Sequence, residues 1–169
     1  SMLVKAKISL NNLLDNVMPG ITDLLYDREQ NHKLTDFVLR YLHFDKISAM
    51  GERRFTTDYC KWAKKQGYIL YERQAKEIFA LVQNGIPALP MTASTTIVVK
   101  EAIKVVRELE NSRASILAQM QTFAKSLPEY SLIREMACVG DTLTPLVIAE
   151  IGDVRNFHSK HALIAYAGI

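Results

Sequence analysis

The sequence predicts an all-α protein, and three features of its pattern support this fold class. Apolar residues recur at spacings of three and four along nearly all of the 169 residues, as on the buried face of amphipathic helices. Almost no segment shows the period of two that marks a half-buried strand. Residues 92–127 contain neither glycine nor proline, and a helix of this length would extend for about 50 Å. We therefore expect helices throughout and no parallel sheet.

The first 91 residues are predicted to form a helical linker region. Glycine and proline punctuate this region, and both residues end helices because glycine is conformationally free and proline lacks an N–H donor. The expected helices cover about residues 3–18, a short segment after residue 20, and residues 33–44, 51–67 and 70–84.

A boundary follows at the segment GIPALPMTAST, where two prolines within four residues break any helix. Thr92, Ser94 and Thr95 offer N-cap side chains for the next helix, over residues 92–127. This helix carries an a/d heptad seam of about four repeats, which is typical of a coiled coil. The same stripe could instead pack on the preceding helices as an ordinary core helix. The seam consists of Val99, Ala102, Val106, Leu109, Arg113, Ile116, Met120, Phe123 and Leu127.

Positive charge gathers in the middle of the chain. Residues 46–76 contain eight Lys or Arg against three Asp or Glu, whereas residues 128–169 contain three against five. A phosphate backbone would therefore be attracted most strongly to the middle segment.

The segment GERRFTTDYCKWAKKQGY places its aromatic and basic residues on different sides of a helix. Helical spacing brings Arg54, Lys61 and Lys65 together, so we expect these cations to face outward. Such a face can bind phosphates, although an ordinary solvated charged face shows the same pattern. The aromatic residues expected to enter the core are Phe55, Tyr59 and Trp62.

Metal and disulfide sites are not expected. Cys60 and Cys138 lie far apart without a CxxC pattern, which favours two buried thiols. His158 and His161 have HxxH spacing but no acidic partner nearby beyond Asp153. No apolar run approaches the roughly 20 residues that cross a bilayer, and no signal peptide is visible, so we expect a cytoplasmic protein with no membrane partner.

The segment ACVGDTLTPLVIAEIGD has the pattern of a helix, a tight turn and a second helix. In a helix-hairpin-helix, backbone N–H groups of such a turn grip a nucleic-acid phosphate without reading sequence. Gly140, Asp141 and Thr142 would be the contact residues here. A plain αα-turn fits the same pattern.

The end of the chain carries a more specific pattern: EIGD, then Phe157, Ser159, Leu163 and finally AYAGI. With the glycine turn, it resembles the C-terminal domain of the bridge-RNA-guided DEDD transposases of insertion sequences, the insertion-sequence-one-hundred-and-ten group that includes the Piv/MooV-type DNA invertases. The close resemblance covers about residues 132–169, within a predicted segment at residues 128–169. The earlier helices agree with the linker of that family in order and character.

The resemblance implies a fragment without an active site. In this family a catalytic serine lies shortly after AYAG, and four metal-binding carboxylates belong to a domain before the coiled coil. We therefore expect no catalytic residue and no metal ligand in this chain, and Ser159 is interpreted as a helix cap. Ser1 before Met2 suggests a tag-removal scar, so both ends are expected to be artificial.

The resemblance also implies cofactors and partners. Mg²⁺ is expected for the full-length enzyme, with DNA and guide RNA as partners and self-association through the coiled coil; the fragment alone is expected to be inactive. A non-catalytic helical adaptor that dimerises and binds a protein partner is the alternative function.

The turn departs from the family pattern. Cys138 replaces the first of two glycines, and a residue with a Cβ admits a phosphate less closely. Pro145 occupies a first-turn position that tolerates proline. A valine at Gly140 is expected mainly to cost stability. The sequence therefore predicts that the basic middle segment dominates nucleic-acid binding.

Overall fold

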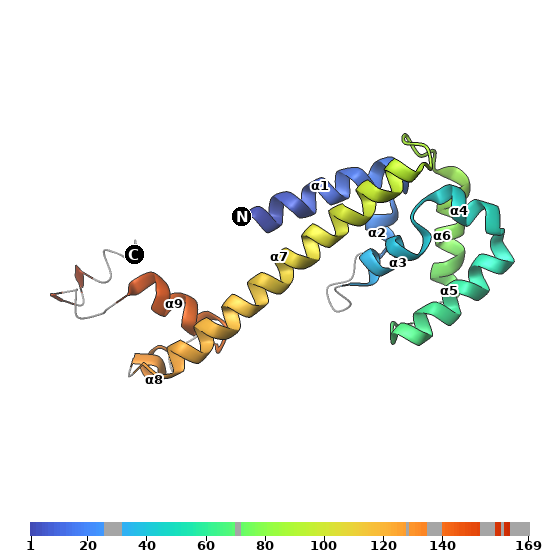
Figure 1. The fold of residues 1–169 in the computed structure, drawn as a ribbon. Coiled ribbons are helices and arrows are strands. Elements are labelled where there is room, and N and C mark those ends of the chain that lie inside the picture. Colours follow the sequence, from blue (N-terminus) through green and yellow to red (C-terminus); the bar gives the residue numbers. More distant parts are fainter. Residues whose placement is uncertain are drawn as a thin grey trace. The chain divides into compact units, whose positions relative to one another are not determined.

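The computed structural model describes residues 1–25, 32–69, 72–127, 129–134, 140–152, 158–159 and 161–162. Within these residues every regular element is a helix, which confirms the predicted all-α fold class (Figure 1). The chain forms two compact units, Ser1–Leu109 (unit 1) and Glu110–Ile169 (unit 2), and each is described by itself.

The helices lie close to their predicted positions. Unit 1 contains α1 (Met2–Val17), α2 (Ile21–Leu25), α3 (Lys33–Tyr41), α4 (Phe44–Met50), α5 (Glu52–Gln66), α6 (Glu72–Asn84) and the first half of α7 (Ala93–Lys125). Unit 2 contains the second half of α7, α8 (Glu129–Arg134) and α9 (Leu143–Ile151). The segment after Ser159, which was interpreted as a helix cap, falls mostly outside the described residues.

The sequence pattern did not predict α4 as a separate helix. Residues 33–44 were expected as one helix, but the chain turns at Leu42, whose φ is 64°. His43 then caps α4, because its Nδ1 accepts a hydrogen bond from the Asp45 N–H at 3.0 Å. Its Nε2 lies 2.8 Å from the Leu89 carbonyl oxygen, so the buried ring also fixes the loop before α7.

An aromatic cluster forms the centre of unit 1. Phe37 and Tyr41 of α3 pack on Phe55, Tyr59 and Trp62 of α5, and all five are buried. The Tyr41 and Phe55 ring centroids are 5.2 Å apart, and those of Phe37 and Tyr59 are 6.0 Å apart. Aromatic pairs of this kind contribute about 0.5–1.5 kcal/mol each beyond the burial of their area. The burial of the α5 aromatics confirms the prediction made for them.

Hydrogen bonds of the buried Lys33 and of Gln74 connect the helices α2, α3, α5 and α6. The Lys33 ammonium donates to Gln74 Oε1 at 2.9 Å and to the Ile69 carbonyl oxygen at 3.3 Å. The same Gln74 oxygen accepts from the Tyr59 hydroxyl at 2.8 Å, and its Nε2 donates to the Leu24 carbonyl oxygen at 3.2 Å. The half-buried Gln74 amide uses both its oxygen and its nitrogen in these bonds, which favours one arrangement of the helices around it.

The first half of α7 is a core helix of unit 1. Figure 1 shows it beside α1, and Val99, Ile103 and Val106 belong to the same buried cluster as Leu10 and Leu14. Near the end of this half, Arg107 donates to Asp36 Oδ1 at 2.5 Å and to the Thr35 hydroxyl at 2.7 Å. These contacts attach α7 to both α1 and α3.

The two halves of the predicted heptad seam therefore have different environments. Val99 and Val106 are buried inside unit 1, as the core-helix interpretation expected, and Ala102 and Leu109 are half-buried. In unit 2 the later seam residues Arg113, Ile116 and Phe123 are exposed, while Met120 and Leu127 are half-buried. Self-association through the second half stays a prediction.

Among the described helices, none has both the length and the apolar character needed to cross a membrane.

Gly85, which follows α6, occupies a position that excludes a side chain. A Cβ built there would lie 2.9 Å from the Leu81 carbonyl oxygen and 3.0 Å from the Phe44 ring. We predict that Gly85→Ala lowers the free energy of unfolding by about 1–3 kcal/mol, the usual cost of overpacking. Denaturant unfolding followed by circular dichroism would measure it.

The matched control is Gly140→Ala. A Cβ at Gly140 would meet no atom within 4 Å, so this variant is expected to unfold like the wild type. If the two variants were equally stable, the close contact at Gly85 would be relieved at no cost by a movement of α6 away from α4, which would contradict the prediction.

Candidate nucleic-acid interface

The exposed side of α5 carries five cations, and we call this set the basic ridge. At about 100° per residue, the five positions fall within roughly 120° of the helix circumference. All five side chains are exposed, as predicted for the three that the sequence had singled out. The basic ridge consists of Arg53, Arg54, Lys61, Lys64 and Lys65.

The rotation of α5 follows from its opposite side. Phe55 and Tyr59 are fully buried and Trp62 is 6% exposed, so the aromatic stripe fixes which side of the helix faces water. Gly51 precedes the helix with φ 76°, and Gly67 ends it in the left-handed region with φ 75°. Glycine adopts this region with little strain, which gives α5 a defined start and end.

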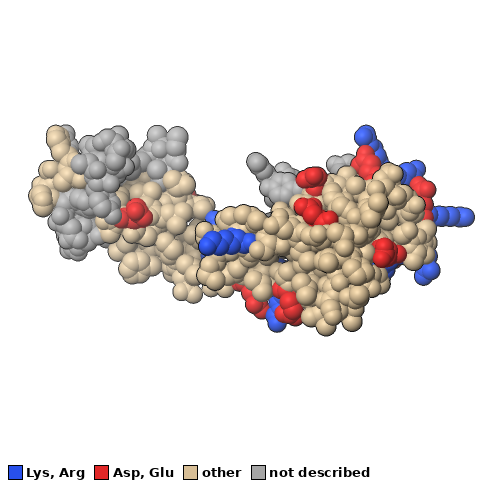
Figure 2. Space-filling model, turned by 90° about the horizontal axis from the view of Figure 1, so that it is seen from above, with Lys and Arg blue, Asp and Glu red and all other residues tan. Residues whose placement is uncertain are grey.

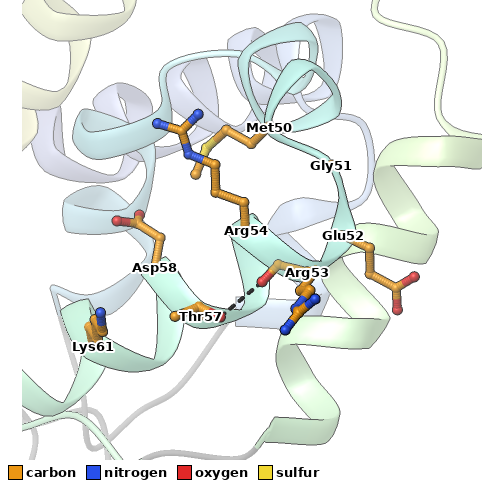
Figure 3. Close-up of a pocket in the computed structure, with 8 residues that line it drawn as sticks. All are labelled: Met50, Gly51, Glu52, Arg53, Arg54, Thr57, Asp58 and Lys61. Atoms are coloured by element: carbon orange, nitrogen blue, oxygen red, sulfur yellow. Dashed lines mark hydrogen bonds between the residues drawn. The ribbon is translucent and has the colours of Figure 1, made fainter.

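A shallow pocket of about 640 Å³ lies at the start of the basic ridge (Figure 3). In Figure 3, Arg54 extends toward Met50 on the side that carries Asp58, whereas Arg53 lies on the other side of the helix start. The Thr57 hydroxyl donates to the Arg53 carbonyl oxygen at 2.9 Å and is therefore already bonded. The pocket is lined by Met50, Gly51, Glu52, Arg53, Arg54, Thr57, Asp58 and Lys61.

Asp58 is an acidic residue beside the basic ridge, and α3 neutralises it. Arg40 donates from Nε to Asp58 Oδ2 at 3.0 Å and from Nη2 to Oδ1 at 2.7 Å. The Tyr41 hydroxyl donates to the same Oδ2 at 2.7 Å. The Arg40 hydrogen bond holds the pKa of Asp58 below its ordinary value, with smaller contributions from Tyr41 and from the charge of Arg54. The carboxylate is therefore ionised but paired.

The surface around α5 is mixed in charge rather than uniformly basic. Figure 2 shows Lys and Arg side chains projecting at the end of unit 1 that α4 and α5 form, with Asp and Glu side chains between them. Lys46 of α4 donates to the Arg40 carbonyl oxygen at 2.9 Å, so its ammonium group is bonded to the backbone of α3. The attraction of this part of unit 1 for a phosphate therefore depends on which of its Asp and Glu side chains are paired with cations.

The predicted helix-hairpin-helix falls in unit 2, and its contact residues are exposed. Gly140, Asp141 and Thr142 precede α9, while residues 135–139, including the Cys138-Val139 part of the turn, lie outside the described residues. Asp141 accepts a hydrogen bond from Arg134 Nε at 2.5 Å, which lowers the pKa of this carboxyl. The Gly140 carbonyl oxygen accepts from the Thr144 N–H and hydroxyl, both at 3.0 Å.

The described surroundings of Gly140 leave room for a side chain. A Cβ built at Gly140 would meet no atom within 4 Å. Nothing in the described surroundings requires glycine at this position. The expected stability cost of a valine at Gly140 therefore has no steric support in these surroundings, and it stays a prediction.

Other candidate groups show no organised site. The residues that the structure describes include no cluster of three or more His, Cys, Asp or Glu side chains placed to hold a metal ion. His158 and His161 are exposed, and Ser159 Oγ accepts a hydrogen bond from the Ala162 N–H at 3.2 Å, as a helix cap does. Cys60 is half-buried rather than fully buried, and Cys138 lies outside the described residues.

Sequence reasoning missed three residues of this surface. Arg53 and Lys64 lie on the same helix as the predicted cations, and the helical angles alone would have found them. Arg40 could not be found in this way, because it lies on α3, 18 residues before its partner Asp58. Only the packing of α3 on α5 brings the two side chains together.

One comparison with known proteins gives a match. Residues 130–169 match the family model described as Transposase IS116/IS110/IS902 family, and residues 1–129 lie outside the match. The match supports a fragment of a transposase of this family, as the C-terminal motif had indicated. No curated protein and no solved structure matches the chain.

The Arg40–Asp58 pair predicts a pH dependence of stability. Because folding lowers the pKa of Asp58, the contribution of the ionised carboxylate is present above its ordinary value of 3.8 and is lost as the pH falls through the lowered pKa. We expect Asp58→Asn to be less stable than the wild type at neutral pH, and the difference to shrink in acid. Urea unfolding followed by Trp62 fluorescence at several pH values would test this.

Asp15→Asn removes an exposed carboxylate of α1 and serves as the control, with little change expected at any pH. A difference between Asp58→Asn and the wild type that is independent of pH would contradict the assigned pair.

Proposed function

We propose that this chain is a helical part of a bridge-RNA-guided DEDD transposase, in which it binds DNA and guide RNA and mediates subunit association. The observation that carries the proposal is the family match at residues 130–169. It coincides with the segment whose motif resembles that family, and the helices before it fit the expected linker. A transposase acts on DNA, so a nucleic-acid surface is required somewhere in the protein.

The chemical step belongs to the whole protein, and this chain supplies no catalytic residue to it. The family's serine and its metal-binding carboxylates match no position of this sequence. Mg²⁺ held by those carboxylates would assist strand cleavage and joining. The donor groups described here include no cluster that fits a metal ion, so we assign no metal-dependent step to them.

The basic ridge is the strongest candidate for nucleic-acid contact in this chain. It presents five exposed cations on one helix, and the acid between them, Asp58, is paired with Arg40. In the hairpin of unit 2, Asp141 likewise forms an ion pair, with Arg134. This ion pair engages the arginine beside the turn, which therefore adds less to the binding of a phosphate. Phosphate affinity grows with the number of cations that displace counterions, which favours the basic ridge over the hairpin.

Subunit association is assigned to the second half of α7. Ile116 is 57% exposed and Phe123 is 67% exposed, and they lie seven residues apart on the same side of the helix. Large apolar side chains at heptad spacing form a helix–helix seam when a second copy covers them. The first half of α7 is unsuited to this role because Val99 and Val106 are already buried.

The nucleic-acid proposal predicts that Arg54, Lys61 and Lys65 contribute together to affinity. Replacing all three by Gln should weaken binding to non-specific RNA or duplex DNA and reduce the salt slope by about one unit for each phosphate that is no longer bound. Fluorescence anisotropy titrations at several salt concentrations would measure both quantities.

Gly140→Val provides the comparison, because its surroundings leave room for a side chain. Loss of binding in this variant, with affinity and slope unchanged in the triple variant, would assign the contact to the hairpin. No binding by any variant or by the wild type would favour a protein-binding adaptor.

The association proposal predicts the effect of a substitution at Arg113. A cation at an a position is costly to bury, so Arg113→Leu should strengthen self-association. Sedimentation equilibrium of both proteins would show it. Asn111→Leu adds the same side chain at an exposed position off the seam and should have a smaller effect. Monomers for both proteins at high concentration would exclude a dimeric coiled coil.

A further inference from the structure

The basic ridge has chemical features that restrict the kind of nucleic acid it can bind. Given the proposed function, on which this inference rests, these features specify the form of the nucleic acid and the way it is held. Three of them matter: the position of the aromatic side chains, the polar groups available beside the cations, and the pairing of Asp58.

Aromatic side chains are absent from the exposed side of α5. Proteins that hold single strands combine cations with exposed aromatic rings on which bases stack. The three aromatic residues of α5, Phe55, Tyr59 and Trp62, are all buried in the core of unit 1. The basic ridge can therefore contact phosphates, but it offers no ring for an unpaired base.

Base-reading groups are few on this surface, since only Arg53 and Arg54 carry the guanidinium fork that binds guanine through paired contacts. Asn and Gln read adenine through paired hydrogen bonds, and neither type occurs between Arg53 and Lys65. The hydroxyl of Thr57, which lies between the cations, already donates to the Arg53 carbonyl oxygen. Three of the five cations are lysines, which act on phosphates as point charges. This composition fits contact with the backbone rather than with base edges.

Arg40 extends the positive surface by cancelling an opposing charge. Without Arg40, Asp58 would place a bare carboxylate in the pocket between Arg54 and Lys61 and repel a phosphate there. The paired hydrogen bonds from Nε and Nη2 hold the guanidinium against both carboxylate oxygens. Arg40 is thus a positioning residue, since it acts on phosphate through Asp58.

We propose that the basic ridge, with Arg40 neutralising Asp58, is a sequence-independent binding surface for the phosphate backbone of duplex DNA. The 15 residues of α5 extend for about 22 Å. Duplex DNA carries about one charge per 1.7 Å of its axis, twice the density of one of its strands, and gains most from a row of cations. DNA is the occupant because the matched family consists of transposases.

The experiment measures binding of the full chain to a short labelled duplex DNA. The same titration is repeated with one of its strands, with a duplex of scrambled sequence and with an RNA duplex of the original sequence. We expect the duplex DNA to bind on the order of tenfold more tightly than the single strand, and the scrambled duplex to bind equally well. The RNA duplex should bind no more tightly than the DNA.

Two single variants test the role of Arg40. Arg40→Gln exposes the charge of Asp58 and should weaken duplex binding about threefold, whereas Asp58→Asn should strengthen it by a similar factor. A purely structural role would make both variants bind more weakly. Trp62 fluorescence would confirm that unit 1 of each variant is folded.

The control removes the same charge elsewhere in unit 1. Lys5, Lys100 and Lys104 are exposed on α1 and α7, and their combined replacement by Gln should affect binding much less than the removal of ridge cations. An equal weakening by both sets of substitutions would show general attraction by net charge and would overturn the assigned surface.

Each outcome bears differently on the duplex-DNA surface and on the proposed function. If binding depends on the ridge cations but the single strand or the RNA duplex binds more tightly than duplex DNA, the nucleic-acid function stands and the duplex-DNA assignment is wrong. A strong preference between the original and scrambled duplexes would overturn sequence independence. If the chain binds no nucleic acid, or ridge variants bind like the wild type, the proposed function at this surface fails as well.

Discussion

The burial of the aromatic stripe of α5 against α3 is the constraint on which the candidate site depends. Once Phe55, Tyr59 and Trp62 enter the core with Phe37 and Tyr41, the rotation of α5 about its axis is fixed. The cations then have to face water, because unpaired charges are not buried. The same contact brings Arg40 to Asp58, so one packing event both exposes the basic ridge and cancels its acidic neighbour.

Partly buried polar contacts hold the helices of unit 1 around this cluster. Gln74 bonds to Lys33, Tyr59 and the backbone of α2, while Asp36 accepts hydrogen bonds from Arg107 and Tyr68. Each contact joins segments far apart in the chain, and because the groups are partly buried, removing one partner would leave a partly desolvated polar group without its bond. These contacts explain why the first half of α7 belongs to unit 1 instead of forming a free heptad seam.

The candidate site combines residues of two kinds. Arg54, Lys61 and Lys65 could be predicted because all three lie on one helix, where the side-chain direction follows from the helical repeat. Arg53 and Lys64 follow from the same repeat. Arg40 could not be predicted, since no periodicity relates α3 to α5. The helix-hairpin-helix expected in unit 2 stays a prediction, because residues 135–139 of its turn lie outside the described residues.

The sequence by itself determined the all-α class, the approximate ends of most helices and the inward side of α5. The motif at about residues 132–169 also indicated a resemblance to the transposase family whose model matches residues 130–169. These features are local, because the helical repeat and helix-ending residues act within a few positions. The tertiary structure alone decided that Leu42 divides α3 from α4, that Val99 and Val106 are buried, and that Arg40 neutralises Asp58. Each of these results from contacts between distant segments, and a single sequence pattern contains no information on which helix packs against which.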